Sequence, residues 1–339
     1  MSETSTTVYH DADADLSVLD DRTIAIIGYG NQGRAQALNL RDSGVSDVIV
    51  GNRADDSRER AREDGFEAFG IGEAVSRADV VFLLIPDEVA PTVYDETIEP
   101  NLSSGDLVNF ASGFNVTYGY IEPADDLDVI LLAPRMIGTM VRQLYERGRG
   151  APSLLAVHQD ATGEALDVAL GLAKGIGSTR SGVVESTFEV ETTTDLMSEQ
   201  ALFPLFVHAI MAKYRAEVEA GVPPEVALLE SYLSREMGYI FEQAAKRGMI
   251  EQLLLHSRTS QYGQLTGLES FDPDPMEAFV RERLEGIQSG EFAEEWREEQ
   301  RKGTPRLDEL FETYRESEMI QREQTIIETL GLDESVSED

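Results

Sequence analysis

The sequence predicts an α/β Rossmann-type domain followed by an all-α domain. From residue 22 to about 184, short apolar runs such as "TIAIIGYG" and "DVIVGNR" alternate with amphipathic stretches such as "NQGRAQALNLRDSG". Continuous β-branched runs separated by helical patterns are typical of a parallel sheet that helices cover on both faces. After about Val184 these runs stop, and a helical period punctuated by glycine and proline follows. We therefore expect a nucleotide-binding domain over 22–184 and a helical domain over 185–330.

The two ends of the chain are acidic. Residues 1–21 read "MSETSTTVYHDADADLSVLDD", and residues 331–339 form a second acidic segment. We expect both to be frayed ends. The first lacks the basic and apolar blocks of a signal peptide, and no run approaches the roughly 18 apolar residues that span a bilayer. These observations predict a cytoplasmic protein with no membrane partner.

The charge is strongly negative along the whole chain. The formal net charge is −36, and 24 of the 28 basic residues are Arg. Such a chain repels nucleic acid and anionic membranes, so neither is expected as a partner. Self-repulsion destabilises the compact state in dilute buffer, whereas molar salt shortens the Debye length to about 3 Å. We therefore hypothesise a halophilic protein of a salt-rich cytoplasm.

A glycine-rich loop follows the first apolar run. Gly28, Gly30 and Gly33 have G-x-G-x-x-G spacing, directly after a predicted strand and directly before a predicted helix. The first glycine permits the tight turn, the second lets the backbone approach a pyrophosphate, and the third allows close packing of helix and strand. This context predicts a dinucleotide-binding loop. The expected cofactor contacts include the residues between these glycines: Tyr29, Asn31 and Gln32.

The second predicted strand, "DVIVGNR", carries conflicting signals about the cofactor. Where an acid that binds the ribose is expected, the residue is Gly51. Arg53 and Ser57 suit a 2′-phosphate, whereas Asp55 and Asp56 would repel it and could accept a hydrogen bond from a free 2′-hydroxyl. The sequence therefore leaves NADPH and NADH open.

Two acids stand four residues apart in "TTTDLMSEQALF". On a helix, the carboxylates of Asp195 and Glu199 would lie about 5–6 Å apart and would repel unless a cation lay between them. The alternative is a solvated acidic face. The chain has no Cys, which excludes a thiolate metal site, and its four His argue against a His-rich zinc centre.

Several stretches of the sequence resemble one enzyme family. They include "GYGNQGRAQALNLRDSGV", "LIPDEVAPTVYDETIEPNL", "GFNV", "AKGIGSTRSGVVESTF", "TDLMSEQAL", "SRTSQYG" and "IQSGEFAEEW". By these stretches the chain resembles the ketol-acid reductoisomerases, in their short, dimeric form with a Rossmann domain and a knotted helical C-terminal domain. That resemblance implies alkyl migration within a 2-acetohydroxy acid, then reduction of the new 2-keto acid by NADPH or NADH, with two Mg²⁺ ions.

The resemblance assigns roles to the acids. By position, Asp195 would bridge the two ions and Glu199 would bind one of them. Glu230 matches a third ligand that the family contributes from the partner subunit, which implies a homodimer or a higher homo-oligomer. The position of the fourth ligand is occupied by Ser234. Carboxylates suit Mg²⁺, which requires oxygen ligands and can polarise a carbonyl.

Two further positions depart from the family pattern. Ser112, in "ASGFN", replaces a histidine, and Arg135, in "APRMIG", replaces a lysine. An arginine keeps the positive charge but cannot act as a proton shuttle. Ser257 matches the substrate-binding serine of the family. The residues expected at the cofactor by the same resemblance are Asp87 and Gly138.

These departures leave three readings of function open. The first is a working ketol-acid reductoisomerase. The second is a paralogue that reduces another 2-keto acid, because migration needs both substrate oxygens clamped and the tertiary hydroxyl deprotonated, whereas reduction needs mainly a polarised carbonyl and a placed hydride donor. The third is a catalytically silent subunit that binds a nucleotide or metabolite. Retention of the three acids argues against the third reading, because a carboxylate cluster without a cation is costly to keep.

Overall fold

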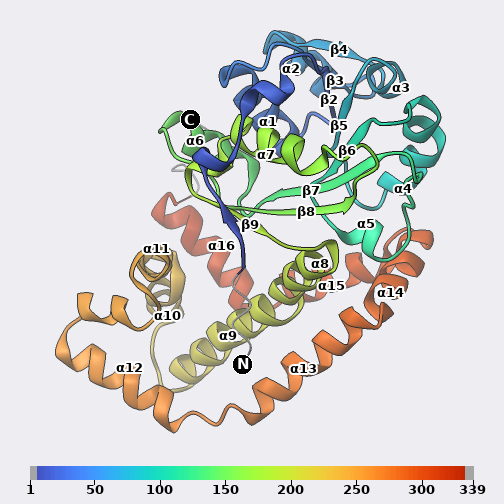
Figure 1. Cartoon of the computed structure of the whole chain (residues 1–339). Helices are drawn as coiled ribbons and strands as arrows, with labels where there is room; N and C mark the ends of the chain where they lie inside the picture. The colour runs from blue at the N-terminus through green and yellow to red at the C-terminus, as the bar shows by residue number, and fades with distance from the viewer. Residues whose placement is uncertain (1–5, 333–339) are drawn as a thin grey trace. The chain divides into compact units, whose positions relative to one another are not determined.

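The first compact unit of the protein is a nine-stranded sheet with helices on both faces (Figure 1). The computed structural model describes residues 6–332, and the chain divides into two compact units between Asp195 and Leu196. The strand order is β1-β9-β8-β7-β6-β5-β2-β3-β4. The strands are β1 (Val8–Tyr9), β2 (Ile24–Ile27), β3 (Val48–Gly51), β4 (Glu67–Phe69), β5 (Val80–Leu83), β6 (Leu107–Phe110), β7 (Asp128–Pro134), β8 (Ser153–Gln159) and β9 (Val183–Glu185).

Helices cover the two faces of this sheet, as predicted. Successive residues of β2 point to opposite faces, so Ile26 joins one hydrophobic core with Leu40 and Leu172, whereas Ile27 joins another with Val75 and Phe188. The Rossmann-type fold is therefore confirmed. The α-helices of this unit are α1 (Asn31–Asp42), α2 (Asp56–Glu63), α3 (Ile71–Val75), α4 (Ala90–Val93), α5 (Phe114–Thr117), α6 (Gly138–Glu146), α7 (Ala165–Gly175) and α8 (Phe188–Met197).

The sheet is mixed, not wholly parallel. The pairs from β4 to β7 are parallel, but β8 runs antiparallel to β7, with Ser153 opposite Pro134. The expectation of a parallel sheet is therefore wrong at this end. The physical reason is that the connection containing α6 begins and ends at the same edge of the sheet, so the returning strand must reverse direction. This connection begins with Arg135.

The N-terminal extension is folded from residue 6 onward. Strand β1 pairs antiparallel with β9, and two 3₁₀ helices follow, η1 (Asp11–Asp13) and η2 (Leu16–Leu19). Lys174 Nζ donates to the carbonyl oxygens of Asp11 (2.9 Å) and Ala14 (2.7 Å), which satisfies backbone groups of the extension. The expectation of a frayed N-terminus is therefore wrong for these residues. Residues 1–5 and the expected frayed tail, 333–339, lie outside the described part of the chain.

The second unit is helical, as predicted, with no strand between residues 196 and 332. Its core contains Tyr214, Leu228, Leu233, Met319 and Ile326. The knotted path implied by the family resemblance stays a prediction. The helical elements are η6 (Ser198–Leu202), α9 (Phe203–Glu219), α10 (Pro224–Leu228), η7 (Leu229–Leu233), α11 (Glu236–Arg247), η8 (Glu251–Leu255), α12 (Arg258–Ser270), α13 (Asp274–Gln288), α14 (Glu291–Arg301), α15 (Pro305–Arg315) and α16 (Glu318–Leu330). Of these, η6 and η7 are π-helical. Within residues 6–332, no helix combines the length and apolar character that a membrane span requires.

Candidate active site

The glycine loop lies between β2 and α1, and its geometry explains two of the three glycines directly. Gly28 has φ +94°, and a Cβ there would lie 2.5 Å from the carbonyl oxygen of Leu84. A Cβ on Gly33 would lie 1.9 Å from the carbonyl oxygen of Gly28. A Cβ on Gly30 would have no heavy atom of the neighbouring protein within 4 Å, so that side of the loop is open to a ligand.

Tyr29 attaches the glycine loop to the core of the first unit. Its side chain is 1% exposed and its hydroxyl donates to Asp64 Oδ2 (2.8 Å), while its ring lies edge-on to Phe66. Its backbone N–H donates to Asn52 Oδ1 (3.2 Å). The side chain of Tyr29 therefore faces the core, and a cofactor could contact only its backbone.

The two polar residues that begin α1 join the glycine loop to the segment after β7. Asn31 Nδ2 donates to Thr139 Oγ1 (3.1 Å), and Gln32 Nε2 donates to the carbonyl oxygen of Met136 (2.7 Å). A Cβ on Gly138 would lie 2.1 Å from the carbonyl oxygen of Asn31, so only glycine permits this close approach. The predicted cofactor residues at 31, 32 and 138 are thus brought together by direct contacts.

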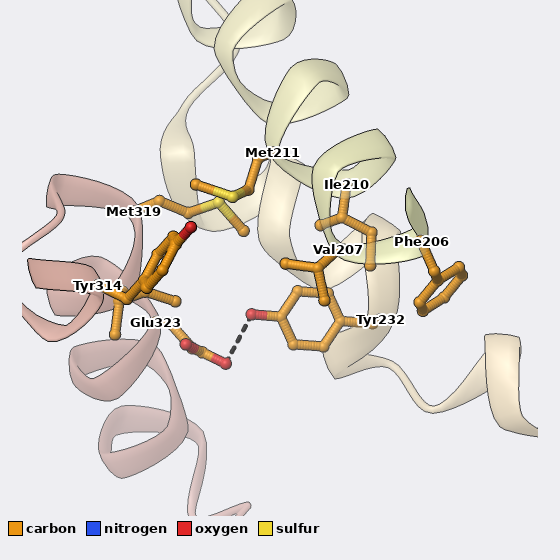
Figure 2. A pocket seen from close by; sticks show the side chains of 9 residues that line it. Phe206, Val207, Ile210, Met211, Tyr232, Tyr314, Met319 and Glu323 are labelled. Carbon is orange, nitrogen blue, oxygen red and sulfur yellow. Dashed lines mark hydrogen bonds between the residues drawn. The ribbon is translucent and has the colours of Figure 1, made fainter. Parts of the chain in front are cut away.

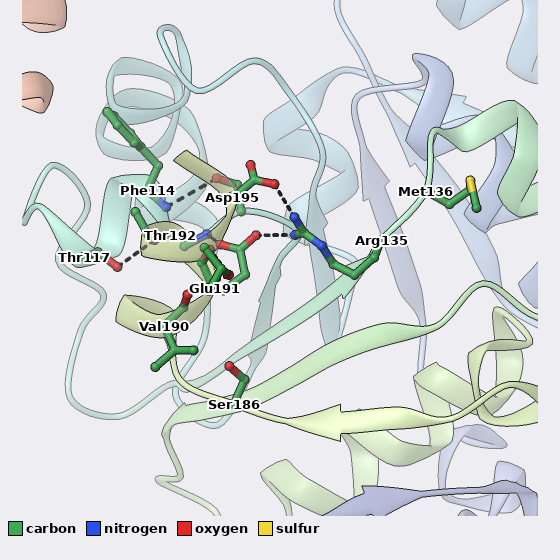
Figure 3. Close-up of polar contacts among 12 residues, drawn as sticks. Phe114, Thr117, Arg135, Met136, Ser186, Val190, Glu191, Thr192 and Asp195 are labelled. Carbon is green, nitrogen blue, oxygen red and sulfur yellow. Dashed lines mark hydrogen bonds and ion pairs between the residues drawn. The ribbon is translucent and has the colours of Figure 1, made fainter. Parts of the chain in front are cut away.

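An ion-pair cluster with one buried carboxylate follows β7 (Figure 3). Arg135 Nη1 donates to Glu191 Oε1 (2.8 Å), and Arg135 Nη2 donates to Asp195 Oδ1. The side chain of Glu191 is only 2% exposed, and this burial raises its pKa, although the hydrogen bond from Gly113 N (2.8 Å) acts in the opposite direction. Arg135 therefore holds two carboxylates of α8, one of them a predicted metal ligand.

The loop after β6 connects this cluster to the loop after β5. Ser112 Oγ donates to Asp87 Oδ2 (3.4 Å), and Asn115 Nδ2 donates to the carbonyl oxygen of Asp87 (3.1 Å). Gly113, the residue after Ser112, donates its backbone N–H to Glu191 Oε2. Because the carboxyl ends of parallel strands form the ligand-binding edge of such a sheet, these contacts gather the predicted residues Asp87, Ser112, Arg135 and Asp195 at one edge.

Glu191 is the member of this cluster that sequence reasoning missed. It stands four residues before Asp195 on α8, one helical turn away. A second acid on the same helical face was the available signal. The sequence alone did not distinguish it from the other acids of this helix, Glu189 among them.

The predicted cofactor residues after β3 form a separate network. Asp55 is the N-cap of α2 and accepts from Ser57 N (3.1 Å), while Arg53 Nε donates to Asp55 Oδ2 (2.6 Å). The bond from Arg53, together with the helix N–H groups, holds the pKa of Asp55 below its usual range. Arg53 and Ser57 therefore both donate to the carboxylate of Asp55.

The remaining candidates belong to the second unit. Glu199 and Glu230 are exposed, and each lies in a π-helical turn, η6 and η7 respectively. Such turns are frequent at functional sites. Ser257 is the N-cap of α12, where its Oγ accepts from Ser260 N (3.3 Å), and Ser234 Oγ accepts from Glu236 N (3.5 Å). Among the described residues, no three acidic or histidine side chains of this one chain are grouped closely enough to hold a metal.

The second unit also contains an apolar cavity of about 390 Å³ (Figure 2). Its single carboxylate, Glu323, accepts a hydrogen bond from Tyr232 (2.6 Å). None of the predicted site residues lines it, so it is not the candidate active site. The lining residues are Phe206, Val207, Ile210, Met211, Tyr232, Tyr314, Met319, Ile320 and Glu323.

The fold and the first unit's site define a nicotinamide-dependent oxidoreductase with a separate helical domain. The open glycine loop and the polar cluster occupy the edge where such sheets bind dinucleotides. Comparison with known proteins narrows this class to one family. Residues 18–182 match the acetohydroxy acid isomeroreductase NADPH-binding domain, and residues 188–330 match the ketol-acid reductoisomerase C-terminal domain. The chain belongs to the ketol-acid reductoisomerase family.

Individual relatives agree with this assignment. A ketol-acid reductoisomerase (NADP⁺) of Pyrobaculum calidifontis is 46% identical over 306 residues, which cover 90% of this chain and 93% of the relative. One of Methanopyrus kandleri is 48% identical over 299 residues, or 87% and 90%. The solved structure of an NADH-preferring ketol-acid reductoisomerase from an uncultured archaeon has a TM-score of 0.88 and 37% identity, covering 98% of this chain and 100% of that one.

Proposed function

We propose that this protein is a ketol-acid reductoisomerase that converts a 2-acetohydroxy acid to a 2,3-dihydroxy acid in branched-chain amino-acid biosynthesis. The observation that carries the proposal is the match over both domains, with 46% identity across 90% of the chain to an enzyme of that name. The expectation of an NAD(P)H-dependent oxidoreductase of this family agrees with every comparison reported above. The substrate class is a small 2-acetohydroxy or 2-keto acid.

The first unit supplies the reducing half of the proposed site. The reduction transfers a hydride from the nicotinamide to the carbonyl carbon and a proton to its oxygen. The open side of Gly30 admits the pyrophosphate, and the contacts of Asn31 and Gln32 fix the loop against the segment that carries Arg135. These contacts fix the glycine loop relative to the segment that carries Arg135. Hydride transfer requires that the nicotinamide be placed accurately against the substrate carbonyl.

Arg135 supplies a fixed positive charge in this site. Its guanidinium is held by Glu191 and Asp195 and cannot give up a proton at neutral pH. It can therefore stabilise developing negative charge or hold a substrate carboxylate, but it cannot replace a lysine as a proton shuttle. This observation favours, as second candidate, a paralogue that performs reduction without alkyl migration.

Mg²⁺ is proposed as the second cofactor. The candidate ligands Asp195, Glu199 and Glu230 are carboxylates, which are the oxygen donors that Mg²⁺ prefers. Glu199 and Glu230 are exposed, and the side chain of Asp195 is 42% exposed despite its bond to Arg135, so a cation can reach each of them. When bound, Mg²⁺ would polarise the substrate carbonyl.

A homodimer, or a larger homo-oligomer, is proposed as the active form. Of the 27 large hydrophobic side chains that are exposed in the described chain, 20 lie after residue 195. Helix α12 has no buried residue, and it carries Tyr262 (73% exposed) and Leu268 (62% exposed). Apolar surface of this extent is typical of protein interfaces. A second copy that covers it could also contribute Glu230, as the family resemblance implies.

A salt-rich cytoplasm is proposed as the working environment, on the net charge of −36. The melting temperature should rise steeply as KCl increases towards molar concentrations, because screening reduces self-repulsion. A melting temperature that does not change with KCl would exclude the proposal.

One substrate panel tests the catalytic proposal. The oxidation of NADH and NADPH should be followed in molar KCl with 2-acetolactate, and separately with the ready-made keto acids 3-hydroxypyruvate and 2-ketopantoate, each with and without Mg²⁺. Mg²⁺-dependent turnover of 2-acetolactate supports the reductoisomerase. Turnover of the keto acids alone would select the second candidate, and no turnover of any substrate would favour a silent subunit.

A further inference from the structure

A single carboxylate organises the loop between β3 and α2. Asp55 Oδ1 accepts from the backbone N–H groups of Ser57 (3.1 Å) and Arg58 (3.3 Å) and from Asn52 Nδ2 (2.7 Å). Asp55 Oδ2 accepts from Arg53 Nε (2.6 Å). Four donors from one short segment thus converge on this side chain, which is 30% exposed.

This carboxylate lies where a Rossmann fold distinguishes the two nicotinamide cofactors. Strand β3 pairs with β2, the strand that leads into the glycine loop, and the residues after the second strand contact the adenine ribose in such folds. Asn52 ties the two segments together, because its Oδ1 accepts from Tyr29 N (3.2 Å) while its Nδ2 donates to Asp55. Asp55 is therefore fixed relative to the glycine loop.

Asp55 occupies several of the donors in this loop that a 2′-phosphate would use. A phosphate is bound by helix N-terminal N–H groups and by arginine. Here two N–H groups of the first turn of α2, those of Ser57 and Arg58, and the Nε of Arg53 donate to the carboxylate. The low pKa of Asp55, caused first by Arg53, keeps it charged at neutral pH, so an arriving phosphate meets a like charge. A free 2′-hydroxyl can instead donate to Asp55 Oδ2.

We infer that this chain prefers NADH to NADPH, and that Asp55 is the residue that excludes the 2′-phosphate. The inference rests on the proposed function, since it concerns the reductant of that reaction. It separates this chain from the relatives of Pyrobaculum and Methanopyrus that are named for NADP⁺. The inferred cofactor preference rests on the hydrogen bonds around Asp55, and not on the sequence identity to these relatives.

Direct binding tests the preference independently of catalysis. The full-length protein in molar KCl is titrated with NADH and with NADPH, and the dissociation constants are read from nicotinamide fluorescence. We expect NADH to bind at least about tenfold tighter, since loss of one charge-assisted contact together with like-charge repulsion has that size. Equal or tighter binding of NADPH would overturn the inference and leave the proposed function intact. Binding of neither cofactor would overturn both.

Substitution of Asp55 tests its role. Asp55→Asn keeps an oxygen that can cap α2 but removes the charge, so the fold should persist and the binding ratio should move about tenfold or more towards NADPH. Arg53→Ala in the Asp55→Asn background should cancel that gain, because the freed guanidinium is the expected phosphate ligand. Glu63→Gln is the matched control: it makes the same charge change at the exposed carboxyl end of α2 and should shift the ratio less than about twofold. A ratio shift in Asp55→Asn no larger than in this control, with an unchanged melting temperature, would overturn the assignment.

Discussion

The two units of this chain differ in the exposure of their candidate functional side chains. In the first unit the side chain of Glu191 is 2% exposed and is bonded to Arg135 and Gly113. In the second unit Glu199 and Glu230 are exposed, and α12 has no buried residue. The candidate residues of the first unit are thus fixed by contacts within that unit. Those of the second unit are accessible, and most of the exposed large hydrophobic side chains of the described chain belong to the same unit, which is consistent with the proposed homodimer.

The largest expected effect comes from mixing two inactive variants. Asp195→Asn and Glu230→Gln should each reduce activity at least about a thousandfold, because each removes a proposed metal ligand. If the two residues act in different subunits, unfolding and refolding an equimolar mixture should restore about a quarter of wild-type activity. Half of the dimers are then mixed, and each mixed dimer holds one intact site.

The control for this experiment is each variant refolded with itself, which should stay inactive. A mixture that is as inactive as the separate variants, in samples shown to exchange subunits by light scattering or labelling, would mean that both residues serve a site within one chain. The exposure of Glu230 would then not indicate that two subunits share one site.

The next effect tests whether the first unit's cluster is functional or only structural. Glu191→Gln keeps a side-chain oxygen for Gly113 N but removes the charge that holds Arg135. We expect kcat to fall about a hundredfold, since misplaced active-site charges have effects of this size. Glu189→Gln, on the same helix but exposed, should change kcat less than about twofold. Equal behaviour of the two variants would reduce Glu191 to a packing role.

Sequence reasoning predicted the local features of the first unit better than its long-range contacts, for physical reasons. The glycine spacing and the apolar run of β2 are local signals, and the structure contains the strand, loop and helix that they predict. Glu191 could not be singled out, because its burial depends on contacts with Arg135 and Gly113, 56 and 78 residues away in the chain. The reversal of β8 and the pairing of β1 likewise depend on distant strands.

A smaller effect compares two glycines of one loop. A Cβ on Gly33 would lie 1.9 Å from the carbonyl oxygen of Gly28, so Gly33→Ala should lower the unfolding free energy by about 2 kcal/mol. At Gly30 a Cβ would have nothing within 4 Å, so Gly30→Ala should change stability by less than about 0.5 kcal/mol. It should nevertheless weaken binding of the dinucleotide, because the methyl group occupies the open side of the loop. Urea unfolding and cofactor titration separate the two outcomes, and equal stability of both variants would contradict the tight packing proposed for this unit.

The smallest effect is a pH dependence within the first unit. Asp64 accepts from Arg34 Nε (2.7 Å) and Nη2 (3.0 Å) and from the hydroxyl of Tyr29, and the Arg34 bond is the main cause that lowers the pKa of Asp64. Its folded pKa lies below its unfolded value of about 4, so the unfolded chain binds the proton more readily between the two values. The stabilisation is therefore present above pH 4 and is lost as the pH falls through the folded pKa. Asp64→Asn should be less stable than wild type at pH 7, and this difference in unfolding free energy should shrink at pH 3. A difference that stays constant with pH would show that Asp64 supports Tyr29 and the glycine loop by shape alone, and that the charge of Asp64 contributes nothing to locking this half of the site.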